Sequence, residues 1–354
     1  MSKGNWDFTK SKTVDFLYLS QEDVIAAGGL DMQGTLEAVE TGFRHHGLGE
    51  YVQPMKPVLR WGDAASEETT GRIMAMPAYL GGDINVAGIK WIPSKPANPA
   101  KYGMPRASAV IVLNDTETGY PIAIMDGTVV SAMRTGAATG VGAKYLARPD
   151  SEVIGLIGAG VQSRTQLMAL HAVLPNVKEA RVYDINRAKA EAFAQEMSEK
   201  LKLRVVAVDS HKAALAEADA FVTATIGTTA YVTPEMVKPG AFHSEISFWD
   251  TQLETLKIYD KIVVDDWKQV SHHKVDVAYR AVKAGVIPES KIYGELGEVV
   301  AGKKPGRERP DERILFNPIG MGINDVAEAY RVFRNAVKLG IGQRLPLWKN
   351  PVWA

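Results

Sequence analysis

The pattern of apolar and polar positions changes near residue 150. From there on, short apolar runs alternate with stretches of helical period. The expected strands are residues 153–157, 180–183, 203–208, 221–226, 241–247 and 261–264, and the expected helices are residues 164–174, 186–200, 211–218, 275–284 and 295–300. Because this alternation is typical of βαβ units, residues 151–324 are predicted to form a parallel sheet covered on both faces.

The first 150 residues follow a different pattern. A strand at 16–19 precedes Ser20-x-x-Asp23, which resembles a capping box at a helix start. A helix over 31–46, strands over 57–61, 72–76, 87–92, 107–113 and 120–125, and a helix over 128–146 are expected next. These elements predict an α+β domain with an antiparallel or mixed sheet. The helix at 325–339 is long enough to return, so this domain is expected to comprise residues 1–150 completed by 325–354.

Composition narrows the class of protein. The 354 residues carry 41 Lys plus Arg and 41 Asp plus Glu, so no net charge favours nucleic acid or an anionic membrane as a partner. The absence of cysteine excludes disulfides and thiolate sites. A polar N-terminus and the lack of a long apolar run predict a soluble cytoplasmic protein.

One stretch, residues 153–163, carries a strong chemical signal. Apolar residues lead into Gly158 and Gly160, small Ser163 follows, and a helix is expected next. The first glycine allows a tight turn, and the second lets the backbone approach a pyrophosphate at a helix N-terminus. Asp184 ends the next strand, where it suits a ribose hydroxyl. The order predicts a dinucleotide-binding, Rossmann-type domain.

The acid at position 184 also predicts the cofactor. A carboxylate accepts hydrogen bonds from ribose hydroxyls but repels a 2′-phosphate, so NAD is favoured over NADP. Arg187 lies nearby in the sequence and keeps NADP open as the alternative.

Four charged residues have unusual sequence surroundings. Lys90 and Arg60 follow apolar strand residues, and Arg134 lies among small helix residues. Asp250 follows a parallel strand at its carboxyl end, where open α/β sheets bind ligands. A buried lysine can act as a base or polarise a water, and two arginines suit two carboxylates. For each residue alone, a structural ion pair is about as good an explanation.

The two histidine pairs do not predict a metal site. His45-His46 and His272-His273 are adjacent in the chain, so their rings point apart, and no carboxylate–histidine spacing accompanies them.

Taken together, these segments resemble the ornithine cyclodeaminase/μ-crystallin family. The marks are Gly88-Ile89-Lys90, Met133-Arg134-Thr135, the 158–163 turn and Asp250. Longer blocks resemble its N-(2-amino-2-carboxyethyl)-L-glutamate dehydrogenase branch, which makes 2,3-diaminopropionate for siderophores: residues 52–60, 88–99, 106–108, 263–267, 295–297 and 317–321.

The resemblance implies a role for each matching position. Arg60, Lys90 and Arg134 would hold the carboxylate of a small amino-acid substrate, and Lys90 and Asp250 would be catalytic. NAD would be bound by residues of the second domain: Gly158, Gly160, Val161, Gln162, Asp184, Arg187, Thr225 and Gly320. The discontinuous first domain would bind substrate and form a homodimer.

One departure bears on the reaction. Met74 stands where ornithine cyclodeaminases have a glutamate, and the Asp-x-Pro-Gly-Lys run is absent after Asp250. The expected reaction is therefore NAD-dependent oxidation of the aminocarboxyethyl-glutamate, whose imine is hydrolysed to 2-oxoglutarate and 2,3-diaminopropionate. Ornithine cyclodeamination, ketimine reduction and non-catalytic ligand binding are the alternatives.

Overall fold

A computed structural model describes residues 13–62 and 71–353 of the chain. Its contacts divide the chain into two compact units, unit 1 with Met1–His45, Gly49–Arg134 and Met321–Ala354, and unit 2 with His46–Leu48 and Thr135–Gly320. Helix α4 (Thr128–Leu146) passes from one unit into the other. Its second half packs closely on α5 (Val161–Val173), because a Cβ on Gly136 would lie 2.4 Å from the Thr165 carbonyl oxygen. The domain bounds at 150 and 324 stay a prediction.

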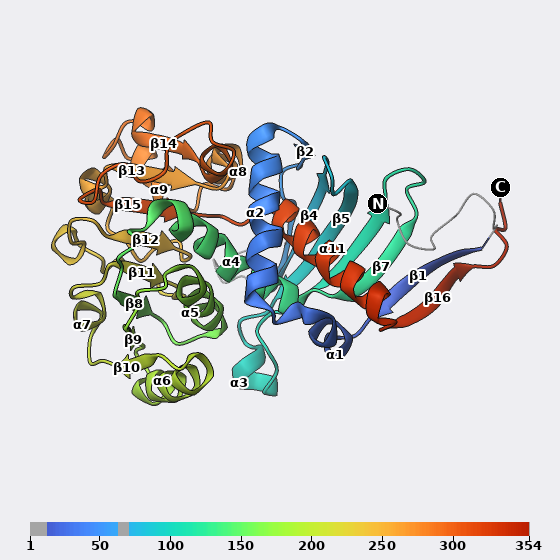
Figure 1. Ribbon diagram of the computed structural model, residues 1–354, viewed down its shortest axis with the longest axis horizontal. Helices are drawn as coiled ribbons and strands as arrows, with labels where there is room; N and C mark the ends of the chain where they lie inside the picture. Colours follow the sequence, from blue (N-terminus) through green and yellow to red (C-terminus); the bar gives the residue numbers. More distant parts are fainter. Residues whose placement is uncertain (1–12, 63–70, 354) are drawn as a thin grey trace. The chain divides into compact units, whose positions relative to one another are not determined.

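Unit 2 is built on an eight-stranded sheet in the order β10-β9-β8-β11-β12-β15-β13-β14, with all pairs parallel. Its strands are β8 (Val153–Ile157), β9 (Glu179–Tyr183), β10 (Arg204–Ala207), β11 (Ala220–Thr223), β12 (Phe242–Glu245), β13 (Lys261–Val264), β14 (Ile292–Glu295) and β15 (Ile314–Asn317). The chain reverses its direction of travel across the sheet between β8 and β11 (Figure 1). A ligand is expected beyond the strand ends at that switch point.

The other helices of unit 2 are α6 (Arg187–Leu201), α7 (His211–Leu215), α8 (Trp267–His273), α9 (Val277–Lys283) and α10 (Leu296–Val300). Strands β14 and β15 and helix α8 were not predicted. The inner strands are buried on both faces, as the fully buried run Ile262, Val263 and Val264 of β13 shows. Because a strand that is buried on both faces is apolar at successive positions, the parallel sheet could be predicted from the sequence.

Unit 1 is built on a second sheet, in the order β16-β1-β7-β6-β5-β4-β2, with β3 pairing β4. The pair β1–β7 is parallel and the others are antiparallel, so the sheet is mixed. The strands are β1 (Val14–Leu19), β2 (Tyr51–Val52), β3 (Val58–Trp61), β4 (Gly71–Leu80), β5 (Val86–Ser94), β6 (Val110–Asp115), β7 (Pro121–Asp126) and β16 (Gln343–Trp348). The predicted α/β fold class with an α+β part is confirmed.

The helices of unit 1 are α1 (Gln21–Val24), α2 (Met32–Leu48), α3 (Asn98–Tyr102) and α11 (Gly322–Leu339). Helix α11 runs along β4 and β5, on the sheet face that carries Lys90 (Figure 1). Ser20 caps α1 in a capping box, as predicted, and the helix continues as a π-turn over Ile25–Gly29. No helix of the described residues combines the length and hydropathy needed to span a bilayer.

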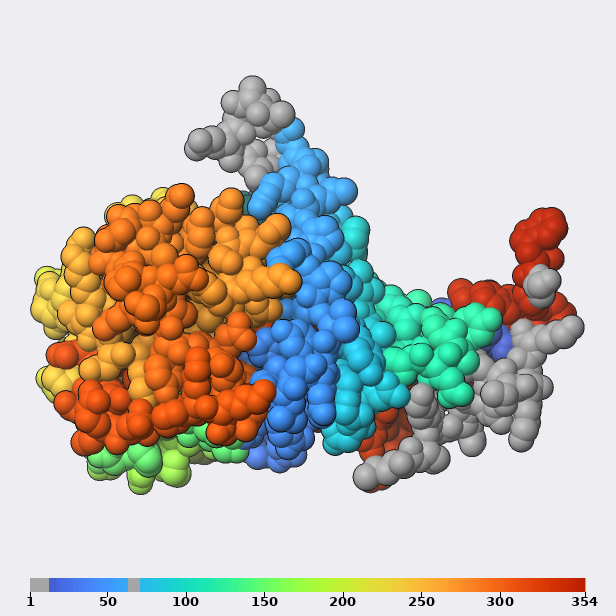
Figure 2. Space-filling view, turned by 90° about the horizontal axis from the view of Figure 1, so that it is seen from above, coloured from blue at the N-terminus to red at the C-terminus, as the bar shows by residue number. Residues whose placement is uncertain are grey.

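The C-terminal tail forms an unpredicted strand, because β16 pairs with the edge of β1. The last described residues follow β16 at this edge of the unit 1 sheet (red in Figure 2), and Val352 and Trp353 are exposed.

Candidate active site

The glycine turn of unit 2 is shaped for an anion. Gly158 has φ +99°, and a Cβ there would lie 2.8 Å from the Ala224 carbonyl oxygen, so only glycine fits. Gly160 precedes α5 with open space beside it and no side-chain cap on the helix. The Ser163 hydroxyl is buried and has no hydrogen-bond partner among the described residues. Unpaired N–H groups at a helix N-terminus, with no Cβ in front of them, fit a pyrophosphate.

The residues around Asp184 fit NAD better than NADP. The Asp184 carboxylate accepts hydrogen bonds from the backbone N–H of Ala159 (2.9 Å) and Asn186 (2.9 Å), and each oxygen keeps capacity for a ribose hydroxyl. The Arg187 guanidinium is occupied by Glu191 and Asp209, so it is not free for a 2′-phosphate. Ile185 follows with 94% of its side chain exposed, an apolar surface that the sequence analysis had not singled out.

Asp250 is fully buried and rigidly held. It lies five residues beyond β12, which ends earlier than predicted. The Thr225 hydroxyl donates to Oδ1 (2.6 Å) and the Ser247 hydroxyl to Oδ2 (2.5 Å). Arg280 stacks on the neighbouring Trp249 ring, 3.6 Å from its centroid. These contacts place the predicted residues Thr225 and Asp250 together.

Two further buried groups surround Asp250, and the sequence analysis missed both. Glu245 ends β12, and its Oε1 accepts the N–H groups of Asp250 (3.2 Å) and Thr251 (3.2 Å). Burial, with a smaller effect of the Asp250 charge, raises the pKa of Glu245 to about 8, although the hydrogen bonds that Glu245 accepts act in the opposite direction. Burial, and then Asp250, also raises the pKa of the Tyr231 phenol, which therefore stays protonated. A glutamate inside a segment predicted as a strand of a parallel sheet covered on both faces was the available signal.

In unit 1, Lys90, Arg134 and Asp325 form a buried charge cluster. Lys90 Nζ donates to Asp325 Oδ1 (2.8 Å) and to the Ser131 hydroxyl (3.2 Å). Arg134 Nε lies 2.8 Å from the same Asp325 oxygen. The other oxygen, Oδ2, has no hydrogen-bond partner among the described residues. With Lys90 charged, the cluster has one positive charge more than its single carboxylate balances.

The surroundings of Lys90 lower its pKa and so favour the neutral amine. Burial, and then the charge of Arg134, lowers the pKa of Lys90 from 10.5 to about 7, although Asp325 acts in the opposite direction. Asp325 was missed because β5 and α11 are far apart in the sequence. It lies in the first turn of α11, where the helix N-terminus stabilises a carboxylate.

The remaining predicted residues lie elsewhere in their units. Arg60 is exposed on β3, directly opposite Arg72, rather than paired with Asp325. In unit 2, the Gly320 N–H donates to Asp265 Oδ2 (2.6 Å), and its φ is +84°. Val161 begins α5 and is 64% exposed, whereas the Gln162 side-chain oxygen is buried.

We expect Lys90→Met to flatten the pH dependence of stability. Lys90 binds its proton less tightly in the folded state than in the unfolded state, so it makes the free energy of unfolding rise between about pH 7 and 10.5. The parent protein should therefore gain on the order of a few kcal/mol from this group over that range, and the variant should not. Urea unfolding at about pH 7 and about pH 9.5 measures the difference. Equal slopes for both proteins would contradict the lowered pKa.

Glu245→Gln should act in the opposite direction. Because the folded-state pKa of Glu245 is raised from 4.5 to about 8, its contribution to stability is complete below pH 4.5 and is lost as the pH rises through 8. Glutamine keeps the oxygen that accepts the two N–H groups and cannot ionise. Between about pH 6 and about pH 9, the free energy of unfolding of the variant should therefore fall less than that of the parent in the same urea assay. Equal losses in both proteins would show that Glu245 is already ionised in the folded protein at about pH 6.

Comparison with known proteins places these features in a family. Residues 18–339 match the model of the "Ornithine cyclodeaminase/mu-crystallin family". The N-((2S)-2-amino-2-carboxyethyl)-L-glutamate dehydrogenase of Staphylococcus aureus is 36% identical over 335 residues, 94% of this chain and 99% of that protein. The alanine dehydrogenase of Archaeoglobus fulgidus is 36% identical over 343 residues, 95% of this chain and 100% of that protein.

Solved structures give the same picture. The Thermococcus litoralis Δ1-pyrroline-2-carboxylate reductase, in complex with NADH and L-proline, has a TM-score of 0.86 and 36% identity, covering 93% of this chain and 100% of that one. An archaeal alanine dehydrogenase dimer with bound NAD has a TM-score of 0.84 and 35% identity, covering 95% and 100%. The predicted NAD cofactor and the predicted enzyme class are confirmed. The chain is an NAD-dependent oxidoreductase and belongs to the ornithine cyclodeaminase/mu-crystallin family.

Proposed function

We propose that this enzyme oxidises N-(2-amino-2-carboxyethyl)-L-glutamate. Hydride leaves the Cα of the glutamate part, and the amine nitrogen loses a proton, which gives an imine. Water adds to the imine carbon, and the C–N bond then breaks. The products are 2-oxoglutarate and L-2,3-diaminopropionate, and the two electrons reduce one NAD⁺. The proposal rests on the relative with this activity, which is 36% identical over nearly the whole of both chains.

In unit 1, Lys90 and Arg134 are assigned to the carboxylate next to the reacting Cα, and Arg60 is assigned to another carboxylate of the same substrate. One observation supports this most directly: a buried lysine and a buried arginine share a single carboxylate, which leaves positive charge for a substrate anion. Arg134 uses only Nε on Asp325, and its terminal nitrogens form no hydrogen bond to the described residues. An amine with a pKa of about 7 can also exchange a proton with the attacking water.

In unit 2, Asp250 is assigned to proton transfer during imine formation and hydrolysis. The two hydroxyls of Thr225 and Ser247 hold the carboxylate in one orientation, as a proton-transfer group requires. NAD, when bound, accepts the hydride. Gly158, Gly160, Val161, Gln162 and Asp184 would hold its pyrophosphate and ribose, and Thr225 and Gly320 would lie nearer the nicotinamide.

The test is a product assay. The protein is incubated with NAD⁺ and the aminocarboxyethyl-glutamate, NADH is followed by absorbance, and the products are identified by mass spectrometry. NADH, 2-oxoglutarate and 2,3-diaminopropionate in equal amounts are expected. Ammonia and proline from ornithine without NADH accumulation would instead indicate a cyclodeaminase. The reductase relative makes a third assay worthwhile, in which NADH is consumed with Δ1-pyrroline-2-carboxylate.

A homodimer is the second part of the proposal. One face of the unit 1 sheet carries a row of apolar side chains on neighbouring strands, with Tyr18, Trp91 and Val110 each at least 40% exposed. The α11 helix packs on the opposite face, which carries Lys90. An apolar sheet face of this kind suits a second copy of the chain, and the archaeal alanine dehydrogenase neighbour is a dimer. Light scattering of the parent and of a Trp91→Glu variant tests it, with a dimer expected for the parent alone.

A further inference from the structure

Three arginines lie side by side at one end of the unit 1 sheet. Arg60 on β3 is directly opposite Arg72 on β4, and Arg72 is directly opposite Ser94 on β5. The Arg106 Nε donates to the Ser94 hydroxyl (3.3 Å), so the third guanidinium continues the same row. Arg60 and Arg106 are exposed, and Arg72 is half-buried. Neither Arg72 nor Arg106 has a role in the proposed function above.

Among the described residues, no carboxylate balances the charge of this row. None of the three guanidiniums has a carboxylate within ion-pair distance in the part of the chain that the structure describes. Like charges directly opposite each other on neighbouring strands destabilise a sheet. Burial, followed by the charges of Arg106 and Arg60, lowers the pKa of Arg72. The three guanidinium groups repel one another while no anion is bound, and a bound carboxylate would offset that repulsion.

The row also lies on the face of the sheet that carries Lys90. Side chains two residues apart on a strand share a face, so Arg72 shares one with Met76, which is directly opposite Lys90. Four residues along a strand separate Arg72 from Met76 by about 13 Å. Two long cationic side chains and a dicarboxylate of five carbons can span such a distance. The planar guanidinium fork binds a carboxylate through two parallel hydrogen bonds.

We propose that Arg72 and Arg106, together with Arg60, form a second carboxylate subsite. It selects amino acids and 2-oxo acids that carry a carboxylate at the end remote from the reacting carbon. The inference rests on the proposed function, which already assigns Arg60 to a substrate carboxylate. It also gives a reason for rejecting ornithine, because a terminal ammonium group would meet three like charges.

Binding of two matched 2-oxo acids tests the subsite. 2-Oxoglutarate and 2-oxopentanoate have the same five-carbon chain, and only the first has the terminal carboxylate. Affinities for the full-length protein with saturating NADH are measured by calorimetry for the parent, Arg72→Gln and Arg106→Gln. Each substitution should lower the affinity for 2-oxoglutarate about 10- to 100-fold, the loss typical of one charge-assisted contact. The affinity for 2-oxopentanoate should stay within about threefold of the parent value.

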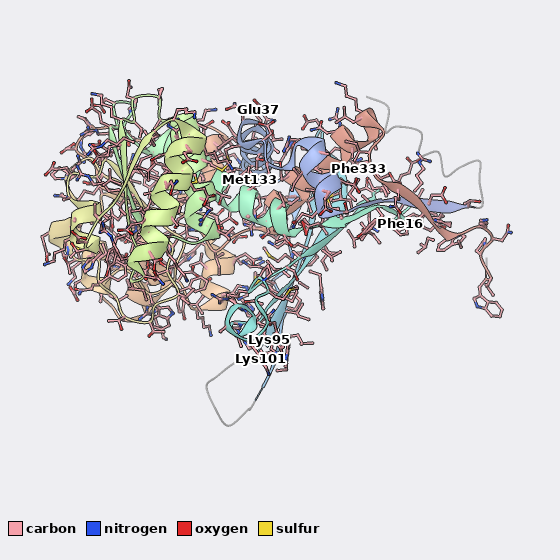
Figure 3. The ribbon with its side chains drawn as sticks, turned by 90° about the horizontal axis from the view of Figure 1, so that it is seen from below. Phe16, Glu37, Lys95, Lys101, Met133 and Phe333 are labelled. Carbon is pink, nitrogen blue, oxygen red and sulfur yellow. The ribbon has the colours of Figure 1, made fainter. Side chains whose placement is uncertain are left out.

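Lys101→Gln is the matched control. Lys101 is an exposed cation on α3 at the same end of unit 1, near Lys95 (Figure 3), and its removal should leave both affinities unchanged. A purely structural role for Arg72 predicts a lower melting temperature for unliganded Arg72→Gln, whereas relief of repulsion predicts an equal or higher one. If Arg72→Gln does not fold, the exposed Arg106 carries the test. Equal weakening of both 2-oxo acids, or no weakening, overturns the subsite.

The two proposals can fail separately. If no 2,3-diaminopropionate forms but the preference for 2-oxoglutarate disappears in Arg72→Gln, the proposed function is wrong and the subsite stands. If the diamino acid forms and the preference survives both substitutions, the proposed function stands and the subsite is wrong.

Discussion

Asp250→Asn is expected to lower turnover by about 10²- to 10⁴-fold, the usual contribution of a positioned proton-transfer group. NAD⁺ affinity should be unchanged, because the variant keeps the size of the side chain and its surroundings can adapt. The hydroxyls of Thr225 and Ser247 now donate to the carboxylate, and either can rotate to accept from an amide instead. Single-turnover NADH formation and NAD⁺ titration measure the two effects.

Ser247→Ala is the matched comparison for this prediction. It removes one hydrogen bond to Asp250 Oδ2 and leaves the carboxylate and its other partner in place. A loss of roughly tenfold or less is expected, in line with one neutral donor. Near-parental turnover in Asp250→Asn, with NAD⁺ bound normally, would remove Asp250 from the mechanism.

Asp325→Asn is expected to produce the largest loss of stability. The fully buried carboxylate is the shared counterion of Lys90 and Arg134, which are themselves 1% and 7% exposed. Removing one partner from a buried ion pair leaves an uncompensated charge and typically lowers the free energy of unfolding by about 3–5 kcal/mol. Because Asp325 raises the pKa of Lys90, the variant should also contain more neutral Lys90 at pH 7.

The double variant Asp325→Asn with Lys90→Met separates charge from shape. If the loss comes from an unbalanced lysine, the second substitution should recover part of it, and a double-mutant cycle with Lys90→Met gives the coupling energy. Urea unfolding at about pH 7 is the measurement. A loss below about 1 kcal/mol in the single variant would mean that water or another group compensates the cations.

These variants probe different properties of the enzyme. The Asp250 variant tests the chemistry, and the Asp325 variant tests how unit 1 holds its cations. The pH profiles of Lys90→Met and Glu245→Gln test the two shifted pKa values, and that of Lys90 bears on its proposed proton exchange with water.

The sequence determined the features that depend on neighbouring residues. The turn at Gly158 and Gly160, the strand before it and the acid after it lie within one βαβ segment, so their spacing alone predicts the NAD site. The parallel sheet was readable because strands such as Ile262–Val264 are apolar on both faces. The boundaries of α4 were predicted because a helical period and its terminal signals are local.

Only the tertiary structure decided which charges meet. Asp325 is 235 positions from Lys90, and no local pattern indicates that α11 places it on the Lys90 amine. In the sequence Arg72 is an ordinary strand residue, and only the register of β3 with β4 shows that it lies opposite Arg60. Glu245 and Asp250 are close in sequence, but burial, which the chain acquires only by folding, sets the pKa of Glu245. Local propensities follow from short-range sterics, whereas ion pairing and desolvation depend on contacts between distant segments.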